Sequence, residues 1–521
     1  MAQHLSRRGF LAGGTSVGLL SGLGDLSFLS KLDPVSAADS VSNPATVKFQ
    51  PEIEPLVRLI EDTPRDRVLE EVADRLRKGT TYREVVTAVQ LAGVRNVQPR
   101  PSVGFKFHAV LVVNSAHLAA QSSPESDRWL PIFWAIDEFK ASQARDVTEG
   151  DWTMSAAHEA SVQKLASEPG VQPQTTLTRF KTAMDRWQPD AADHTAAALA
   201  RVGSAKDLFP MFARMGARDF RSIGHKAIFV ANGFRTLQHI GWHHSEPMLR
   251  AIAYALQNHS GEPNPGDNDL AADRPWRHNQ KLAFRIKGEL PDGAADSDST
   301  RELVRSLRTC SATQASDVVV DMFNKKVSVQ SVTDGLYLAA VELLLRQRGI
   351  IAMHAVTTTN ALQYAFRQLT SGGGHEETRR LLLLQNASFL PMFRDAMRGR
   401  GQVGDAAIDE LQPVRTSTGA EGLDDIYDDV GRNHFQAAGK TLDWLNAGND
   451  GKSFIDAARR LIFLKGNNSH DYKFSSATLE DYAHISPVWR NQFLAASVFN
   501  LRGTNDRDNG LVQRTRAALK S

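Results

Sequence analysis

The chain has 521 residues, of which 41% are hydrophobic and 23% are charged, as in an ordinary soluble globular protein. Its 61 basic and 59 acidic residues leave a formal net charge of +2, which gives no support to nucleic-acid or anionic-membrane binding. The single cysteine, Cys310, excludes a disulfide framework, a multi-thiolate metal site and a covalent haem attachment motif within one chain.

The N-terminus has the pattern of a twin-arginine export signal. Ser6-Arg7-Arg8-Gly9-Phe10-Leu11 contains the paired arginines, a glycine-rich apolar stretch follows, and Val35-Ser36-Ala37 offers a cleavage site. Asp25 interrupts the apolar stretch, so it is a poor spanning helix. We predict a signal peptide at residues 1–37, a mature chain at residues 38–521, and a periplasmic or extracellular protein without a stable membrane span. The twin-arginine export machinery is then a partner, and because it moves folded proteins, it favours a cofactor inserted before export.

The mature chain is predicted to be a single all-α domain. Apolar residues recur at helical spacing, whereas alternating strand-like runs are scarce and residues 316–322 are ambiguous. Gly-, Pro- and Thr-containing segments at residues 261–275, 291–299 and 398–424 are predicted to be surface loops. The predicted helical segments are residues 56–77, 129–144, 208–220, 248–257, 336–347, 362–369, 379–397 and 454–464.

Four histidines recur at near-equal intervals along the chain. His108, His225, His354 and His470 are separated by 117, 129 and 116 residues. Each follows an apolar helix that ends near a glycine or a turn, and each precedes a second helix, a loop with helix-start residues and a third helix. We therefore predict four related helix–loop–helix units around a common interior, toward which the histidines point. An asparagine follows three of the four histidines by six or seven residues: Asn114, Asn232 and Asn360.

A metal centre is the sharpest interpretation of these histidines. Four neutral imidazoles suit iron, copper or zinc. Lys473 follows His470 by three residues, which places both on one helix face. A lysine beside a metal must lose its charge to coordinate it, and can do so as a carbamate formed with carbon dioxide. The competing interpretations are structural polar contacts between units, histidine acid–base chemistry and, for Lys473, a solvated surface side chain.

Other histidines compete for these roles. His117 is an alternative ligand to His108, and His239 is an alternative to His225 or an acid–base group that faces the substrate. His243 and His244 are predicted to lie in a loop, where they are exposed or cap a helix. Metalloprotease His-Glu-X-X-His and serine-hydrolase Gly-X-Ser-X-Gly motifs are absent.

Short motifs at four places are similar to those of one known family. Gly224-His225 and Gln238-His239-Ile240-Gly241-Trp242 look like Gly-His and His-Leu-Gly-Tyr elements before an alanine-rich helix. Met353-His354-Ala355-Val356-Thr357 looks like a His-X-Val-Thr segment, and Ser469-His470-Asp471-Tyr472-Lys473 looks like a His-X-X-Lys segment. Phe107-His108 is the weakest match. Through these motifs, the chain resembles the questin oxidase-like family over most of residues 100–500.

This resemblance implies a helical non-haem iron oxygenase. Family members cleave polycyclic aromatic ketones, including anthraquinones, and one branch resembles an iron enzyme with four histidines and a carboxylated lysine. The implied partners are dioxygen and a small aromatic or ketone substrate, although the export signal departs from the usual family pattern. Carried over to this chain, the implied ligands of Fe(II), with zinc or copper as alternatives, are His108, His225, His354, His470 and a carboxylated Lys473.

Two other functions fit the same sequence. A metal-dependent hydrolase would use the same ligands to activate water. A non-catalytic helical-repeat protein would bind a partner and leave the histidines scattered, more than about 10 Å apart, since metal–nitrogen bonds are about 2 Å long. We expect an exported oxidoreductase, and the distances among the four histidines are the observation that best separates these alternatives.

Overall fold

The computed structural model describes residues 45–99, 105–167, 173–257, 264–265 and 267–520. The predicted export signal and its cleavage site lie outside the described residues. The chain from Val47 to Ser521 forms one unit. Among the described helices, none is both long and apolar enough to cross a bilayer.

The described residues form α-helices and short 3-10 turns without a β-strand, so the all-α prediction is confirmed. The ambiguous residues 316–322 belong to α16 (Ala312–Asn324). Ser311 and Gln314 begin this helix with reciprocal side-chain to backbone hydrogen bonds, which satisfy N–H groups that have no partner within the helix.

The predicted helix at residues 56–77 is two helices, α2 (Glu54–Asp62) and α3 (Val68–Arg77). Pro64 causes the break, because a residue before proline is driven out of the helical region, and Thr63 has an extended ψ of 131°. The loop predicted at residues 398–424 ends earlier than expected, since α20 begins at Gly419.

Each of the four histidines lies on the second helix of a three-helix segment, and in the first segment a break at Val112 divides that helix in two. The first helix of every segment begins at a side-chain cap, provided by Thr81, Ser204, Ser328 and Asp450 in turn. Common ancestry of the four segments stays a prediction. The segments are α4 (Tyr82–Asn96), α5 (His108–Leu111) with α6 (Val113–Gln121), and α7 (Leu130–Glu149); α11 (Ala205–Gly216), α12 (His225–Ile240) and α13 (Ser245–Gln257); α17 (Val329–Arg346), α18 (Ile350–Gln368) and α19 (Glu376–Arg398); α22 (Gly451–Lys465), α23 (Ser469–Asp481) and α24 (Arg490–Ser497).

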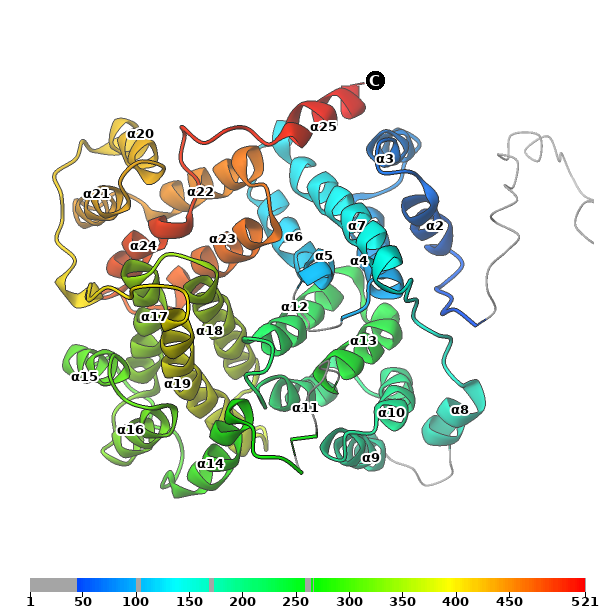
Figure 1. Ribbon diagram of the computed structural model, residues 1–521, viewed down its shortest axis with the longest axis horizontal. Coiled ribbons are helices and arrows are strands. Elements are labelled where there is room, and N and C mark those ends of the chain that lie inside the picture. Colours follow the sequence, from blue (N-terminus) through cyan, green and yellow to red (C-terminus); the bar gives the residue numbers. More distant parts are fainter. Residues whose placement is uncertain (1–44, 100–104, 168–172, 258–263, 266, 521) are drawn as a thin grey trace, which may run out of the picture. The chain divides into compact units, whose positions relative to one another are not determined.

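The histidine-bearing helices form a closed ring of neighbours (Figure 1). α12 packs against α18, α18 against α23, α23 against α5 and α6, and these two against α12. In the C-terminal halves of three of these helices, Arg235 of α12 contacts Asn360 of α18 and Glu480 of α23. Because the N-terminal ends also meet, as described below, these helices run in the same direction. α18 is buried along most of its length.

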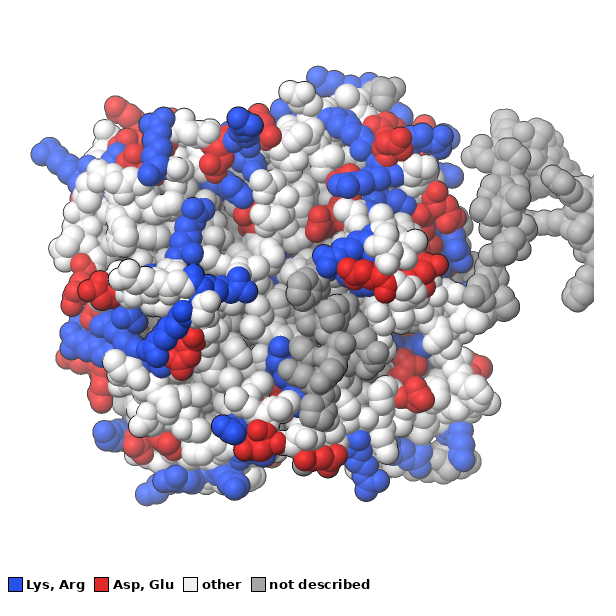
Figure 2. All heavy atoms as spheres, in the orientation of Figure 1, with Lys and Arg blue, Asp and Glu red and all other residues white. Residues whose placement is uncertain are grey.

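Further helices complete the unit. Basic and acidic side chains are interspersed on the face shown in Figure 2, in line with the net charge near zero. These helices are α8 (Glu159–Ser167), α9 (Pro173–Asp185), α10 (Pro189–Val202), α14 (Arg274–Leu282), α15 (Ser297–Leu307), α16, α20 (Gly419–Val430), α21 (His434–Asn446) and α25 (Gly510–Lys520), together with α2 and α3.

Candidate metal centre

The four predicted histidines lie near the N-terminal ends of their helices. His108 and His225 are the first residues of α5 and α12, and His470 is the second residue of α23. His354 is the fifth residue of α18. The prediction that each helix follows its histidine is therefore wrong in detail, by a full turn in α18. That helix begins directly after Gly349, whose φ of 154° is available to glycine.

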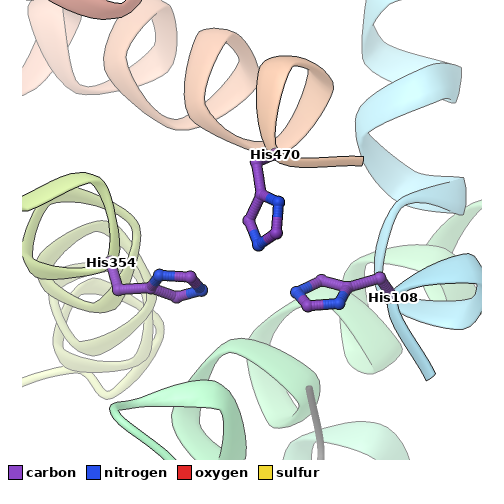
Figure 3. A group of neighbouring side chains, drawn as sticks. All are labelled: His108, His354 and His470. Atoms are coloured by element: carbon purple, nitrogen blue, oxygen red, sulfur yellow. The ribbon is translucent and has the colours of Figure 1, made fainter. Parts of the chain in front are cut away.

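These four side chains converge, and we call them the four-histidine cluster. Figure 3 shows three of them, His108, His354 and His470, pointing toward one another. Neighbouring ring centroids are separated by 4.9 Å (His108–His225), 4.4 Å (His225–His354), 5.2 Å (His354–His470) and 4.4 Å (His470–His108). The His108 and His354 centroids are farther apart, at 6.4 Å. One ligand nitrogen from each of His108, His354 and His470 lies within 4.8 Å of the others. The rings thus form a four-membered circuit with His108 opposite His354.

Backbone carbonyls determine which nitrogen of two rings carries hydrogen. His225 Nδ1 lies 2.6 Å from the Ser222 carbonyl oxygen, and His354 Nδ1 lies 2.6 Å from that of Ile350. A carbonyl oxygen only accepts, so each Nδ1 must donate a proton. In the neutral rings, each Nε2 then presents a lone pair to the interior of the cluster.

Hydrogen bonding does not account for all of the short distances between Nε2 atoms in the cluster. His225 Nε2 lies 3.0 Å from His108 Nε2 and 3.0 Å from His354 Nε2. Between His225 and His354 two lone pairs face each other without a hydrogen, which is repulsive unless a cation lies between them. Two ligands at a right angle with metal–nitrogen bonds of about 2.1 Å would be about 3.0 Å apart. The donor set therefore fits a metal ion bound by imidazole.

Burial keeps the cluster neutral. It is the largest cause that holds the pKa of His108, His225 and His354 well below the ordinary 6.5, and it lowers the pKa of His470 to about 3. The charge of protonated Lys473 lowers all four pKa values further. At neutral pH the imidazoles do not have to release a proton before they bind a metal.

Lys473 lies beside the cluster rather than on the surface. Its side chain is buried, and its Nζ has no hydrogen-bond partner among the described residues. Burial lowers the pKa of this amine from 10.5 to about 7, so a large fraction is neutral near pH 7. A neutral amine is the form that captures carbon dioxide. His470 Nε2 is likewise buried without a partner in the described part of the chain.

A strained turn presents His225 to the cluster. Ile223 has a φ of 42° and Gly224 a φ of 82°, so two successive residues occupy the left-handed region, which is costly for a β-branched residue. A Cβ at position 224 would lie 1.8 Å from Thr358 Oγ1 on α18. Only glycine allows α12 and α18 to approach closely at this point.

The other candidate histidines lie elsewhere. The ring centroids of His117 and His239 lie 3.7 Å apart with an interplanar angle of 31°, and the Tyr82 hydroxyl lies 3.3 Å from His117 Nδ1. His239 is 14 residues beyond His225 on α12, which is about 21 Å along the helix axis. This is too far for His239 to exchange a proton with a group held by the four-histidine cluster.

His243 and His244, which follow α12, differ in solvent exposure. The two were predicted to be exposed or to cap a helix; His243 is exposed, whereas His244 is buried. His244 ends a 3-10 turn (Trp242–His244), and its burial lowers the pKa of its imidazole to about 4.

Sequence reasoning missed the groups that hold the histidines. The carbonyl oxygens of Ser222 and Ile350 have no side-chain signature, although the four-residue spacing from Ile350 to His354 follows once the start of α18 is known. A second missed contact joins Ser469, just before His470, to Glu138 of α7 at 2.7 Å between Oγ and Oε1.

Comparisons of the chain with known protein families, with curated proteins and with solved structures found no match.

Proposed function

We propose that this chain is a metal-dependent oxidoreductase, a non-haem iron oxygenase that acts on a small aromatic or ketone substrate. The observation that carries the proposal is the pair of Nε2–Nε2 distances of 3.0 Å, with the Nδ1 hydrogens of His225 and His354 turned away toward carbonyls. This arrangement is stable with a cation between the rings and unfavourable without one. It gives no support to scattered histidines on a repeat surface.

The shape of the cluster favours iron or copper over zinc. Zinc prefers a tetrahedron, in which all ligand pairs are equally far apart. Here the His108–His354 centroid distance of 6.4 Å exceeds the 4.4 to 5.2 Å between neighbours, as expected when ligands surround an ion with right angles between them. Iron rather than copper rests on the resemblance to the questin oxidase-like family.

Each part of the site has a role under this proposal. The four imidazoles would hold the ion, and Lys473, as an amine or a carbamate, would supply a fifth ligand. The hydrogen bonds that His225 and His354 donate to backbone carbonyl oxygens fix the orientation of both rings, which raises the basicity of the proposed ligating nitrogens. Burial of His108, His225 and His354 limits the access of bulk water to the reacting groups. When bound, iron would supply one-electron chemistry and a position for dioxygen.

Metal analysis of the purified mature chain tests the proposal. We expect close to one iron per chain in the parent protein and almost none in His354→Ala, with the fold retained by circular dichroism. His117→Ala is the matched control, because it removes a histidine from the other pair and should keep the metal. Absence of stoichiometric metal from both parent and control would overturn the proposal.

A second measurement separates oxygenase from hydrolase. An oxygenase consumes dioxygen in the presence of an aromatic ketone, whereas a hydrolase with bound zinc does not. The export prediction is tested separately: N-terminal sequencing of the secreted chain should begin at Ala38.

A further inference from the structure

The protein does not hold the rings of the four-histidine cluster equally. His225 and His354 each donate from Nδ1 to a backbone carbonyl oxygen at 2.6 Å. The His470 ring forms no such hydrogen bond within the described part of the chain, and its buried Nε2 has no partner there. An acceptor behind a ligating imidazole fixes the ring, and its loss typically costs roughly 10–100-fold in metal affinity. His470 lacks this support.

His470 also differs from the other three histidines in its contacts and its exposure. His225 Nε2 lies 3.0 Å from the Nε2 atoms of His108 and His354, whereas His470 Nε2 makes no contact of this kind. Figure 3 shows the His470 ring pointing toward the space between His108 and His354. These two residues and His225 are buried, but His470 is partly exposed. A partly exposed ring without a hydrogen bond can change its rotamer at little cost.

The backbone around His470, by contrast, is firmly held. The Asn468 side chain caps α23 and accepts from the backbone N–H of His470 at 2.9 Å. The hydroxyl of Ser469 donates to a carboxyl oxygen of Glu138 at 2.7 Å. The imidazole can therefore turn by rotation of its own side chain, while α23 and Lys473, about one turn farther along it, stay in place.

The number of proposed ligands requires that one of them can leave. Four imidazoles and Lys473 make five donors, which leaves one of the six positions around an octahedral ion, whereas non-haem iron oxygenases with three protein ligands keep several positions open. A substrate with two neighbouring oxygen donors needs two positions. Lys473 is buried, so its departure would leave a buried polar group without a partner, which is costly. His470 is partly exposed and can bind water instead.

We propose that His470 is the exchangeable ligand of the four-histidine cluster, and that its ring turns away when a substrate with two neighbouring oxygen donors, of the catechol class, binds. The inference rests on the proposed function, because a bound metal is needed for a ligand to exchange. His225 and His354 keep their places, since their Nδ1 hydrogen bonds hold both rings.

Cobalt(II) titrations of the purified chain test whether the ligands are held unequally. His225→Ala should lower the Co(II) affinity by roughly 100-fold or more, whereas His470→Ala should lower it by roughly tenfold or less. Added imidazole should restore the parental visible spectrum of Co(II) in His470→Ala. Equal losses of affinity in the two variants would overturn the inference while metal binding stands. A parent chain that binds no metal would instead overturn the proposed function.

Proton NMR of the Co(II)-loaded parent chain tests the exchange itself. Each bound imidazole gives paramagnetically shifted ring signals, so the parent should show four sets. Catechol, which has two neighbouring oxygens, should remove one set, the same set that is missing from His470→Ala, whereas phenol, which has one oxygen, should remove none. Failure of catechol to bind, or loss of a different set, would overturn the inference. Four sets with catechol bound would also overturn it, because Lys473 would then be the ligand that leaves.

Discussion

The two ends of the central helix ring both bury polar groups, and they satisfy them differently. At the far end, Arg235 donates to Glu480 at 2.8 and 2.7 Å, and Asn360 donates to Glu480 and Asp481 at 3.1 and 2.8 Å. At the near end, histidine lone pairs face each other and Lys473 Nζ has no described partner. A buried polar group without a partner is costly. The far end is therefore satisfied mainly by its own side chains, with Asp481 Oδ2 left without a partner among the described residues, whereas the near end would be completed by the proposed metal ion.

The largest expected effect comes from a substitution at the far end of the helix ring. Arg235→Met leaves the carboxylate of Glu480 without its guanidinium partner, and loss of one member of a buried pair costs about 3–4 kcal/mol of unfolding free energy. Urea denaturation measures this loss, and metal content should be unchanged. Arg67→Met is the control, because its pair with Glu71 is exposed and should be worth less than about 1 kcal/mol. Equal effects of both substitutions would show that the far end is not a cooperative network.

A bound metal ion should supply the missing partner for the histidine nitrogens at the near end. At a free iron concentration of one hundred times Kd, binding to the folded chain alone adds about 2.7 kcal/mol to the unfolding free energy. The expected observation is a rise in melting temperature with added metal in the parent chain and in Arg235→Met. His354→Ala should show no rise. A rise in His354→Ala equal to that of the parent would place the metal elsewhere.

Two buried lysines give the next contrast. Lys473→Met removes an unpaired amine, so the metal-free chain should gain about 2 kcal/mol of unfolding free energy while its metal affinity falls. Lys226 is buried as well, but its Nζ pairs with Asp219 at 2.7 Å, so Lys226→Met should destabilise the chain. Changes of the same sign, measured by urea denaturation of both metal-free variants, would contradict the comparison.

The smallest effect concerns pH at the far end. Burial raises the pKa of Asp481 from 3.8 to about 8, so between these values the folded chain binds a proton that the unfolded chain lacks. Unfolding free energy from this group therefore falls as pH rises through that window. Asp481→Asn removes the effect, so between pH 6 and pH 7 its unfolding free energy should rise relative to that of the parent by about 1.4 kcal/mol. Parallel pH profiles for the two chains would contradict it, and the histidine contributions cancel in the difference.

The sequence predicts the helices and the four histidines well for a physical reason. Apolar spacing reports a buried helix face, and repeated local context reports an equivalent position, so both survive without knowledge of tertiary contacts. The histidine period does not include Lys473, which enters through its three-residue spacing from His470 and through the family resemblance. The Arg235–Glu480 pair escaped detection because its partners are 245 residues apart, and the carbonyls of Ser222 and Ile350 escaped because every residue has one.

The close approach of α12 and α18 at Gly224 limits the substitutions that position 224 can tolerate. Gly224 offers no atom to a metal, yet its missing side chain sets how closely α12 approaches α18, and thereby how far His225 Nε2 stands from His354 Nε2. In a saturation library, position 224 should be as intolerant as position 225 when metal retention is the selected trait. A residue with no functional group would then rank among the ligands in a mutational map of this protein.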